Sequence, residues 1–298
     1  MTNGGCFDAC LGANVLQITV AHTHIAQTSF AKTYFAYTNE GQYMPTTLIV
    51  TAHPEPNSFT NEWARASAKA CEELGHKVIW SDLYEMAFDP VERAANFKDQ
   101  SPNAHFDILK AQDTATENNN FADDIAREQD KIRQADRIIF HYPIWWFKEP
   151  AILKGWCDRV LASSAMHTVD ERYDQGRFKF TRALFCVNTG ANAHECAPDG
   201  KEGNLEMLLW PMAHTLRYLG MTTMKPVCAH GVHSYHAGDT KIKLETYLAG
   251  ILDNQINVIR DFDKRDIIKF NADDDFDDNG SLKPDAKSYS DFVRHEDR

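Results

Sequence analysis

The sequence predicts an α/β protein built on a doubly wound parallel sheet of five strands, with helices on both faces. Apolar residues run together in short segments, such as LIV at 48–50, without the alternation of a half-exposed strand. Such runs are typical of strands that are buried on both faces. Each run is followed by a longer segment with helical spacing, and strands that alternate with helices form parallel sheets through right-handed crossovers.

The first strand and the first helix are predicted over residues 46–52 and 58–74. Ser58 is placed to cap the helix, because a serine hydroxyl accepts a hydrogen bond from the amides of the first turn. Glu62 follows in that turn, where a carboxylate interacts favourably with the helix dipole. Gly75 is expected to end the helix, since glycine readily adopts the left-handed conformation found there.

The middle of the chain continues this alternation less regularly. HKVIWSDL at 76–83 predicts the second strand, and DRIIFHYP at 136–143 predicts the third. Between them, the apolar spacing of residues 121–135 predicts a helix. Residues 84–120 are polar and show no period, and ENNN at 117–120 is typical of a loop, so this region is expected to be irregular.

The second half of the chain returns to regular alternation. The expected helices cover 150–161, 204–220 and 241–260, and the expected strands cover 182–191 and 223–231. Pro150 suits the opening turn of its helix, because the N–H that proline lacks would be unpaired there anyway. Pro211 falls inside a helical pattern and is expected to interrupt it.

The two ends of the chain differ from the domain predicted over residues 44–262. Residues 1–43 have no lysine or arginine before Lys32 and show no period. We expect a disordered N-terminal extension there, with Met44 as the biological start; the alternative is a short structured arm on a partner subunit. The aspartate-rich segment 263–298 is expected to form a polar tail that packs on the domain or on a dimer partner.

Composition excludes several classes of protein. A net charge of −12 opposes binding to phosphate backbones, so no nucleic-acid partner is expected. No apolar run approaches the ~20 residues that a membrane-spanning helix needs. The seven cysteines are scattered without a CxxC pair, which predicts a reduced, cytoplasmic protein. Nothing in the spacing of His194, Cys196, His230 and His233 requires a metal, and no metal site is predicted.

The stretch HPEPNSFT, at 53–60, follows the first strand, and ligands of open α/β sheets bind beyond the carboxyl ends of the strands. A helix N-terminus offers unpaired N–H groups and partial positive charge, which suit a phosphate. His53, Ser58 and Thr60 add side-chain donors. The stretch lacks both the Walker lysine and GxGxxG, so a bound phosphate or pyrophosphate is expected rather than NTP hydrolysis. The alternative is that Ser58 only caps the helix and that His53 is an ordinary loop histidine.

Two further strand ends are suited to a ligand. One offers a flat apolar surface, and at the other a ligand can come close to the backbone. Trp145, Trp146 and Phe147 are consecutive after a buried strand. Because three such neighbours cannot all point into the core, they are expected to wall a ligand site. NTGA at 188–191 contains a glycine, where the backbone can approach a ligand closely. A planar ring system that carries phosphate fits these three ends together, and a flavin answers that description.

Several motifs together make the resemblance to a known family specific. AHPEPNSF, SDLY, YPIWWFKEPAILKGWCDRV, NTGA and LLWP, in this order between residues 46 and 262, resemble the flavodoxin-like NAD(P)H:quinone dehydrogenase family. The resemblance implies a flavodoxin-like fold and a non-covalently bound FAD, with FMN as the alternative. It also implies NAD(P)H as a substrate, a quinone or similar planar electron acceptor, two-electron transfer by a ping-pong mechanism, and a homodimer whose active sites use both chains.

The resemblance also assigns the site residues. The residues expected to bind the cofactor are His53, Ser58, Phe59, Thr60, Asp107, Pro143, Ile144, Trp145, Trp146, Phe147, Asn188, Thr189, Gly190, Ala191 and Cys196. The residues expected to take part in catalysis are Trp146, Phe147, Thr189 and His167. Met166, His167 and Thr168 fall where the family's substrate pocket receives residues from the partner subunit.

The chain departs from the family at the groups that stabilise the reduced flavin. Where relatives have a tyrosine and a histidine, this chain has Cys196 and Glu202. His194, His230 and His233 are the alternative candidates for a proton relay, because each is titratable and close to a strand end. Three other functions stay open: a flavin-binding docking subunit of a potassium-efflux system, a flavodoxin-type electron carrier, and a protein that has lost its cofactor.

Overall fold

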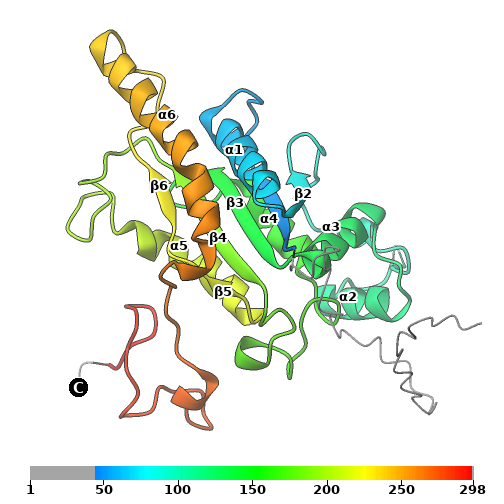
Figure 1. The fold of residues 1–298 in the computed structure, drawn as a ribbon. Helices are drawn as coiled ribbons and strands as arrows, with labels where there is room; N and C mark the ends of the chain where they lie inside the picture. Colours follow the sequence, from blue (N-terminus) through cyan, green and yellow to red (C-terminus); the bar gives the residue numbers. More distant parts are fainter. Residues whose placement is uncertain (1–43, 102, 297–298) are drawn as a thin grey trace, which may run out of the picture. The chain divides into compact units, whose positions relative to one another are not determined.

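A computed structural model describes residues 44–101 and 103–296, and the predicted extension 1–43 lies outside the described residues (Figure 1). All paired strands of the sheet are parallel, and the main path runs in the order β2-β1-β3-β4-β5. The strands are β1 (Thr46–Thr51), β2 (Lys77–Asp82), β3 (Arg137–Pro143), β4 (Arg182–Asn188), β5 (Thr222–Thr223) and β6 (Val227–Ala229). The predicted fold class is confirmed.

The predicted fifth strand, 223–231, is wrong in one respect: it consists of two short pieces, β5 and β6, which both pair with β4. Pro226 lies between them and has no N–H to donate to a strand ladder. The N–H of Lys225 donates to the carbonyl of Asp266 at 2.7 Å, so the chain is drawn toward the C-terminal tail at this point.

Helices cover both faces of the sheet, as expected from the alternation (Figure 1). Their bounds are α1 (Phe59–Glu73), α2 (Ile108–Glu117), α3 (Asp123–Gln134), α4 (Ala151–Val160), α5 (Leu205–Tyr218) and α6 (Asp239–Arg260). Helices α1 and α6 pack with Ile49, Ile139 and Leu184 on one face. Helices α3, α4 and α5 pack with Val50 and Phe140 on the other, so alternate residues of each central strand serve opposite cores.

The expectation of irregular structure throughout 84–120 is wrong, because α2 occupies residues 108–117. Only Gln112 and Ala115 of this helix are buried, so its sequence carries no apolar stripe to reveal it. Its start was nevertheless signalled: the Asp107 carboxylate accepts a hydrogen bond from the N–H of Lys110, as an N-cap does.

The interruption expected at Pro211 is also wrong, since α5 runs through it. Proline removes one hydrogen bond from the helix, but tertiary packing can outweigh that loss. Leu209, Met212 and Ala213 are buried against the sheet on both sides of Pro211, which holds the helical path.

The segment after α6 packs against the domain. Ile268 donates its N–H to the carbonyl of Thr223, and the ring of Phe292 stacks on Trp210 of α5 at 4.6 Å. Within the described residues, no helix is both long and apolar enough to cross a membrane.

The strand order places the topological switch point between β1 and β3, and we call the region at the carboxyl ends of these strands the crevice. From β1 the chain moves outward to β2 and then returns to β3 on the other side of β1. The loops that follow β1 and β3 therefore lead away from each other, which is where ligands of doubly wound sheets bind.

Candidate functional site

The loop between β1 and α1 presents a helix N-terminus to this crevice. The hydroxyl of Ser58 accepts a hydrogen bond from the N–H of Asn61 at 3.3 Å, so the predicted cap is confirmed. Among the described residues, the N–H groups of Phe59 and Thr60 have no hydrogen-bond partner. These two donors, at the positive end of the helix dipole, are suited to an anionic group such as phosphate.

The side chain of Asn61 anchors the same loop through hydrogen bonds. Its amide Nδ2 donates to the carbonyls of His53 and Glu55 at 3.3 and 3.0 Å, and its Oδ1 accepts from the Thr51 hydroxyl at 2.6 Å. Arg65 adds a hydrogen bond to the carbonyl of Pro56 at 2.9 Å. Asn61 was not among the predicted site residues, although an amide directly after Thr60, in the first turn of the helix, was a readable signal.

His53 is half-buried at the edge of the loop, with its ring 5.9 Å from that of Trp145. The N–H of Glu55 donates to Nδ1 at 3.0 Å. Burial lowers the pKa of His53, and the interactions with Glu55 oppose part of that shift. A neutral ring whose Nδ1 accepts a hydrogen bond carries its hydrogen on Nε2, so His53 offers one N–H donor to the crevice.

The three aromatic residues lie on a tight turn that extends from β3. The N–H of Trp145 donates to the carbonyl of Lys148 at 2.9 Å, and the N–H of Lys148 donates back at 3.1 Å. The two residues between them, Trp146 and Phe147, have φ angles of 50° and 65°. Two-residue turns with positive φ normally use Asn-Gly, so bulky side chains here store backbone strain.

These aromatic side chains are exposed rather than buried. Trp146 is 93% exposed, Phe147 48% and Trp145 41%. The preceding Pro143 is buried as the last residue of β3, and the N–H of Ile144 donates to the carbonyl of Asn188 at 2.8 Å. A strained turn that presents large apolar rings to solvent points to a ligand or partner that covers them.

The NTGA loop after β4 joins the other two strand ends. The buried hydroxyl of Thr60 donates to the Oδ1 of Asn188 at 2.8 Å. Thr189 donates its N–H to Ala229 and accepts from Val232, which fixes the loop on the segment after β6. Because the Thr60 hydroxyl is committed to Asn188, Thr60 can offer a phosphate its backbone N–H but not its hydroxyl hydrogen.

Gly190 leaves the space beside this loop open. A Cβ built at this position would meet only the carbonyl oxygen of Val232, at 4.0 Å. The neighbouring Ala191 donates its N–H to the Thr189 hydroxyl at 3.3 Å. A planar ring can therefore approach the backbone at Gly190 without meeting a side chain.

Three of the predicted residues belong to segments other than the three strand-end loops. Asp107 caps α2 and borders a small cavity of about 120 Å³ between α2 and residues 97–100. Cys196 is buried, and burial together with the Glu202 and Glu195 carboxylates raises its pKa. His167 lines a cavity of about 390 Å³.

His167 lies between the end of α5 and the residues that follow the aromatic turn. Its ring meets the ring of Tyr218, at the end of α5, edge-on at 5.0 Å, and the same cavity is lined by Lys148 and Glu149 of the aromatic turn. Of its own neighbours, Met166 is fully buried in the core and Thr168 accepts a hydrogen bond from the N–H of Glu171. Within the 166–168 segment, His167 is therefore the residue best placed to meet another molecule.

The candidate relay histidines differ in their surroundings. His194 and His233 are exposed, and His233 stacks on His236 with ring centres 4.0 Å apart. His230 is half-buried, with Nδ1 3.9 Å from the Cys228 sulfur. Burial lowers the pKa of His230, and hydrogen bonding to the Ala191 backbone opposes the shift.

Within the described residues, no three His, Cys, Asp or Glu side chains are grouped to hold a metal ion.

The assembled residues fit a flavin on three structural grounds. The N–H groups of Phe59 and Thr60 offer donors to a phosphate, the turn at 145–147 offers flat apolar rings, and Gly190 leaves backbone open to a ring edge. The hydrogen bonds from Thr60 and Ile144 to Asn188 tie the three loops together. A preorganised crevice of this kind suits a ligand with one anionic end and one planar end.

Comparison with known proteins is consistent with this geometry. The profile of the family described as "Flavodoxin-like fold" matches residues 45–251. A ribosyldihydronicotinamide dehydrogenase-like protein of Penicillium crustosum is 36% identical over 195 residues, covering 62% of this chain and 73% of that protein. A ribosyldihydronicotinamide dehydrogenase [quinone] of Mus musculus is 33% identical over 204 residues, covering 67% and 87%.

Solved structures show the same relationship. A crystal structure described as a putative quinone reductase from Klebsiella pneumoniae superimposes with a TM-score of 0.70 and 28% identity, covering 80% of this chain and 94% of that chain. An NAD(P)H:quinone oxidoreductase from Methanothermobacter marburgensis superimposes with a TM-score of 0.53 at 21% identity, which supports the fold alone.

Proposed function

The chain belongs to the flavodoxin-like fold family, and from that membership we propose that it is a flavin-dependent NAD(P)H:quinone oxidoreductase. One observation carries the proposal. The crevice at the carboxyl ends of β1, β3 and β4 combines free helix N-terminal N–H groups with an exposed aromatic turn. The relatives whose names include quinone dehydrogenase supply the reaction class.

We propose FAD as the cofactor, with FMN as the alternative. The N–H groups of Phe59 and Thr60 would hold the phosphates, with the Nε2 hydrogen of His53 beside them. Trp145 and Phe147 would flank the ring, and the backbone at Gly190 would meet its edge. A bound flavin supplies two-electron hydride chemistry between the nicotinamide and the quinone.

The side chains of this site orient substrates and exclude water rather than form covalent bonds. Nicotinamide and quinone are both flat, and one aromatic surface can receive them in turn, which gives ping-pong kinetics. Holding each ring against the cofactor lowers the entropic part of the barrier. We propose Trp146, Phe147, Thr189 and His167 as the residues that contact the substrates.

We propose His230 as the group that accepts a proton near the reacting ring, because burial lowers its pKa and leaves a neutral imidazole. Its half-buried imidazole lies beside the Ala191 backbone, in the segment that supports the NTGA loop. Cys196 is less suited, because burial raises its pKa and a protonated thiol that resists ionisation transfers a proton poorly near neutral pH.

We propose a cytoplasmic homodimer in which His167 reaches the crevice of the partner subunit. The exposure of Trp146 and of Val169, at 93% and 73%, supports a covering partner. The five cysteines of the described residues are free thiols, as expected in a reducing compartment.

The test is the visible absorption spectrum of the purified protein, followed by NAD(P)H without oxygen. A yellow protein that bleaches fully, regains its colour with a quinone and shows no semiquinone would support two-electron transfer. A colourless protein that cannot be loaded with FAD or FMN would contradict the proposal. It would leave the docking subunit of a potassium-efflux system as the surviving alternative.

A further inference from the structure

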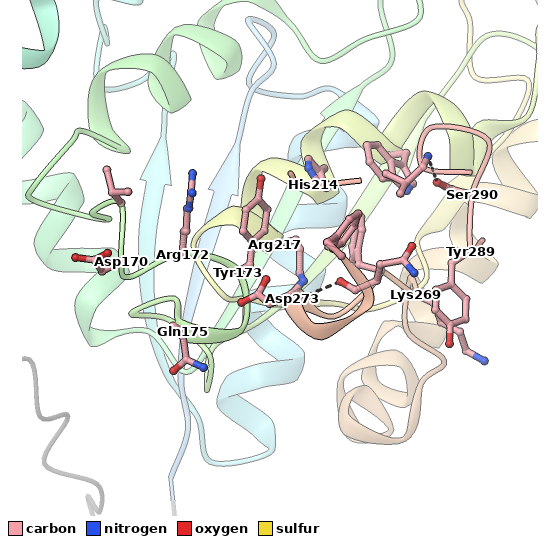
Figure 2. A pocket seen from close by; sticks show the side chains of 17 residues that line it. Asp170, Arg172, Tyr173, Gln175, His214, Arg217, Lys269, Asp273, Tyr289 and Ser290 are labelled. Atoms are coloured by element: carbon pink, nitrogen blue, oxygen red, sulfur yellow. Dashed lines mark hydrogen bonds between the residues drawn. The ribbon is translucent and has the colours of Figure 1, made fainter. Parts of the chain in front are cut away.

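A cavity of about 540 Å³ lies between the segment 169–175, α5 and the tail from Lys269 to Val293 (Figure 2). None of the residues predicted to bind the flavin lines it. Its volume is within the range of sites that take small molecules, and it is large enough for one or two fused rings. The cavity is therefore a candidate for a second site, with a lining separate from that of the crevice.

Aromatic side chains from all three segments line the cavity. They are Tyr173, Trp210, Phe270, Phe276 and Tyr289. Phe270 packs against two rings of α5, with its ring centre 5.4 Å from that of Trp210 and 5.6 Å from that of His214. A wall of rings that hold one another in place suits a flat aromatic molecule better than a flexible chain.

Trp210 meets the cavity with its edge. Its ring is sandwiched between those of His214 and Phe292, with ring centres 4.5 and 4.6 Å away and nearly parallel planes. Because both faces are covered, only the edge of Trp210 remains for a ligand. The edge of an aromatic ring carries partial positive charge and packs favourably against the flat face of another ring.

The backbone at Tyr173 is strained. Its φ angle is 49°, a conformation that residues with bulky side chains rarely adopt. The side chain is held by ring contacts, edge-on with Tyr218 at 5.1 Å and tilted with His214 at 5.8 Å. Strain of this kind is concentrated at ligand sites, where it fixes the position of a side chain, so it supports a role for this ring at the cavity.

The charges of the cavity wall cancel. The charged residues that line it are Asp170, Arg172, Arg217, Lys269 and Asp273. Arg217 is paired with Asp174, which leaves two lining cations and two lining acids. Figure 2 shows Arg172 and Lys269 at opposite ends of the cavity, so one charged group cannot meet both of them. A charged ligand would lose its hydration here without a net opposite charge to replace it, which favours a neutral ligand.

We propose that this cavity is a binding site for a neutral, flat aromatic molecule of one or two fused rings. The face of the ligand would lie on the edge of Trp210. The rings of Tyr173 and Tyr289 would enclose it from the 169–175 segment and from the tail. The lining is separate from that of the crevice, so this inference does not depend on the proposed function.

The probes are three flat molecules of nearly the same shape: neutral 2-naphthamide, anionic 2-naphthoate and cationic 2-naphthamidine. Each is titrated by calorimetry into the full-length protein as purified, with no flavin added. We expect 2-naphthamide to bind. The two charged probes should bind at least about fivefold more weakly, because the wall offers no net charge in exchange for the water that they lose.

Two variants locate the ligand, Tyr173→Gly and Tyr289→Gly, which each remove one ring of the wall. Glycine accepts the positive φ angle of Tyr173, and Tyr289 is 42% exposed, so both variants should fold. Each should weaken the binding of 2-naphthamide about tenfold. The matched control is Tyr235→Gly, at a tyrosine outside this cavity that is 90% exposed, and it should bind 2-naphthamide like the wild type.

Three results would overturn the proposal. Equal or tighter binding of a charged probe would show that the site does not select a neutral ligand. Unchanged binding of 2-naphthamide in both Tyr173→Gly and Tyr289→Gly, or its loss in Trp146→Ala, would place the ligand outside this cavity. Absence of 2-naphthamide binding to the wild type would show that the cavity does not take a small aromatic molecule.

Discussion

The loop at 53–61 and the turn at 145–148 face the same crevice but are built in opposite ways. In the loop, Asn61 and Arg65 satisfy three backbone carbonyls, and a serine caps the helix. In the turn, two bulky residues hold positive φ angles and their rings face solvent. The loop is therefore stabilised by its own hydrogen bonds. The turn instead carries backbone strain and exposes its aromatic side chains.

The largest effect should come from breaking the stable region. Asn61→Leu removes three hydrogen bonds and leaves the buried Thr51 hydroxyl without its acceptor. We expect the free energy of unfolding to fall by about 3 kcal/mol, since lost buried hydrogen bonds add to the cost of an unsatisfied group. Urea unfolding measures this. Asn57→Ala, at an exposed position of the same loop, should stay close to wild type; an equal loss there would contradict the comparison.

The strained turn should respond in the opposite direction. Trp146→Asn/Phe147→Gly places the residues that such turns prefer, and we expect it to raise the free energy of unfolding by about 1–2 kcal/mol. The same change removes two rings from the crevice, so FAD affinity should fall about tenfold. Thermal unfolding and flavin titration together test this.

The matched control for that variant is Ala87→Gly, which relieves a φ of 49° in a turn after β2. It should also stabilise the protein, by about 1 kcal/mol, but should leave FAD affinity unchanged. If Ala87→Gly weakened flavin binding as much as Trp146→Asn/Phe147→Gly, the loss of affinity could not be assigned to the aromatic rings of the turn.

The two regions also differ in how far the sequence predicts them. Ser58 and Glu62 act within one helical turn, so the cap and the start of α1 could be read locally. The turn conformation could not, because tryptophan and phenylalanine disfavour positive φ and nothing local indicates it. The sequence therefore placed Trp146 in the crevice without revealing its strain.

Features that depend on distant segments were missed for a similar reason. Helix α2 buries only Gln112 and Ala115, so no periodic pattern marked it. The cavity of about 540 Å³ beside Trp210 joins three separate segments between residues 169 and 293, and its lining has no shared motif. The positions of the strands and their ends follow from short-range patterns, whereas tertiary cavities depend on how remote segments pack.

A smaller effect should separate the roles of the Thr60 hydroxyl and its backbone. Thr60→Val keeps the shape of the side chain but removes the donor to Asn188 Oδ1. We expect the free energy of unfolding to fall by about 1 kcal/mol, with flavin affinity changed less than about threefold, because the proposed phosphate contact uses the backbone N–H of Thr60 and not its hydroxyl. Thr60→Ser should restore stability. A large loss of FAD affinity with unchanged stability would mean that the hydroxyl itself binds the cofactor.

The smallest effect should be the pH dependence contributed by His53. Burial lowers its pKa in the folded state, so the unfolded chain binds the proton more tightly. Its contribution to stability is therefore complete above the unfolded value of about 6.5 and is lost as the pH falls from there through the lower folded pKa. Protonation would also remove the Nδ1 acceptor for the Glu55 N–H and so loosen the loop. Unfolding free energy measured between neutral pH and mildly acidic pH should fall less in His53→Gln than in the wild type. A steeper fall in the variant would show that His53 is charged in the folded protein and that the loop does not depend on its neutral form.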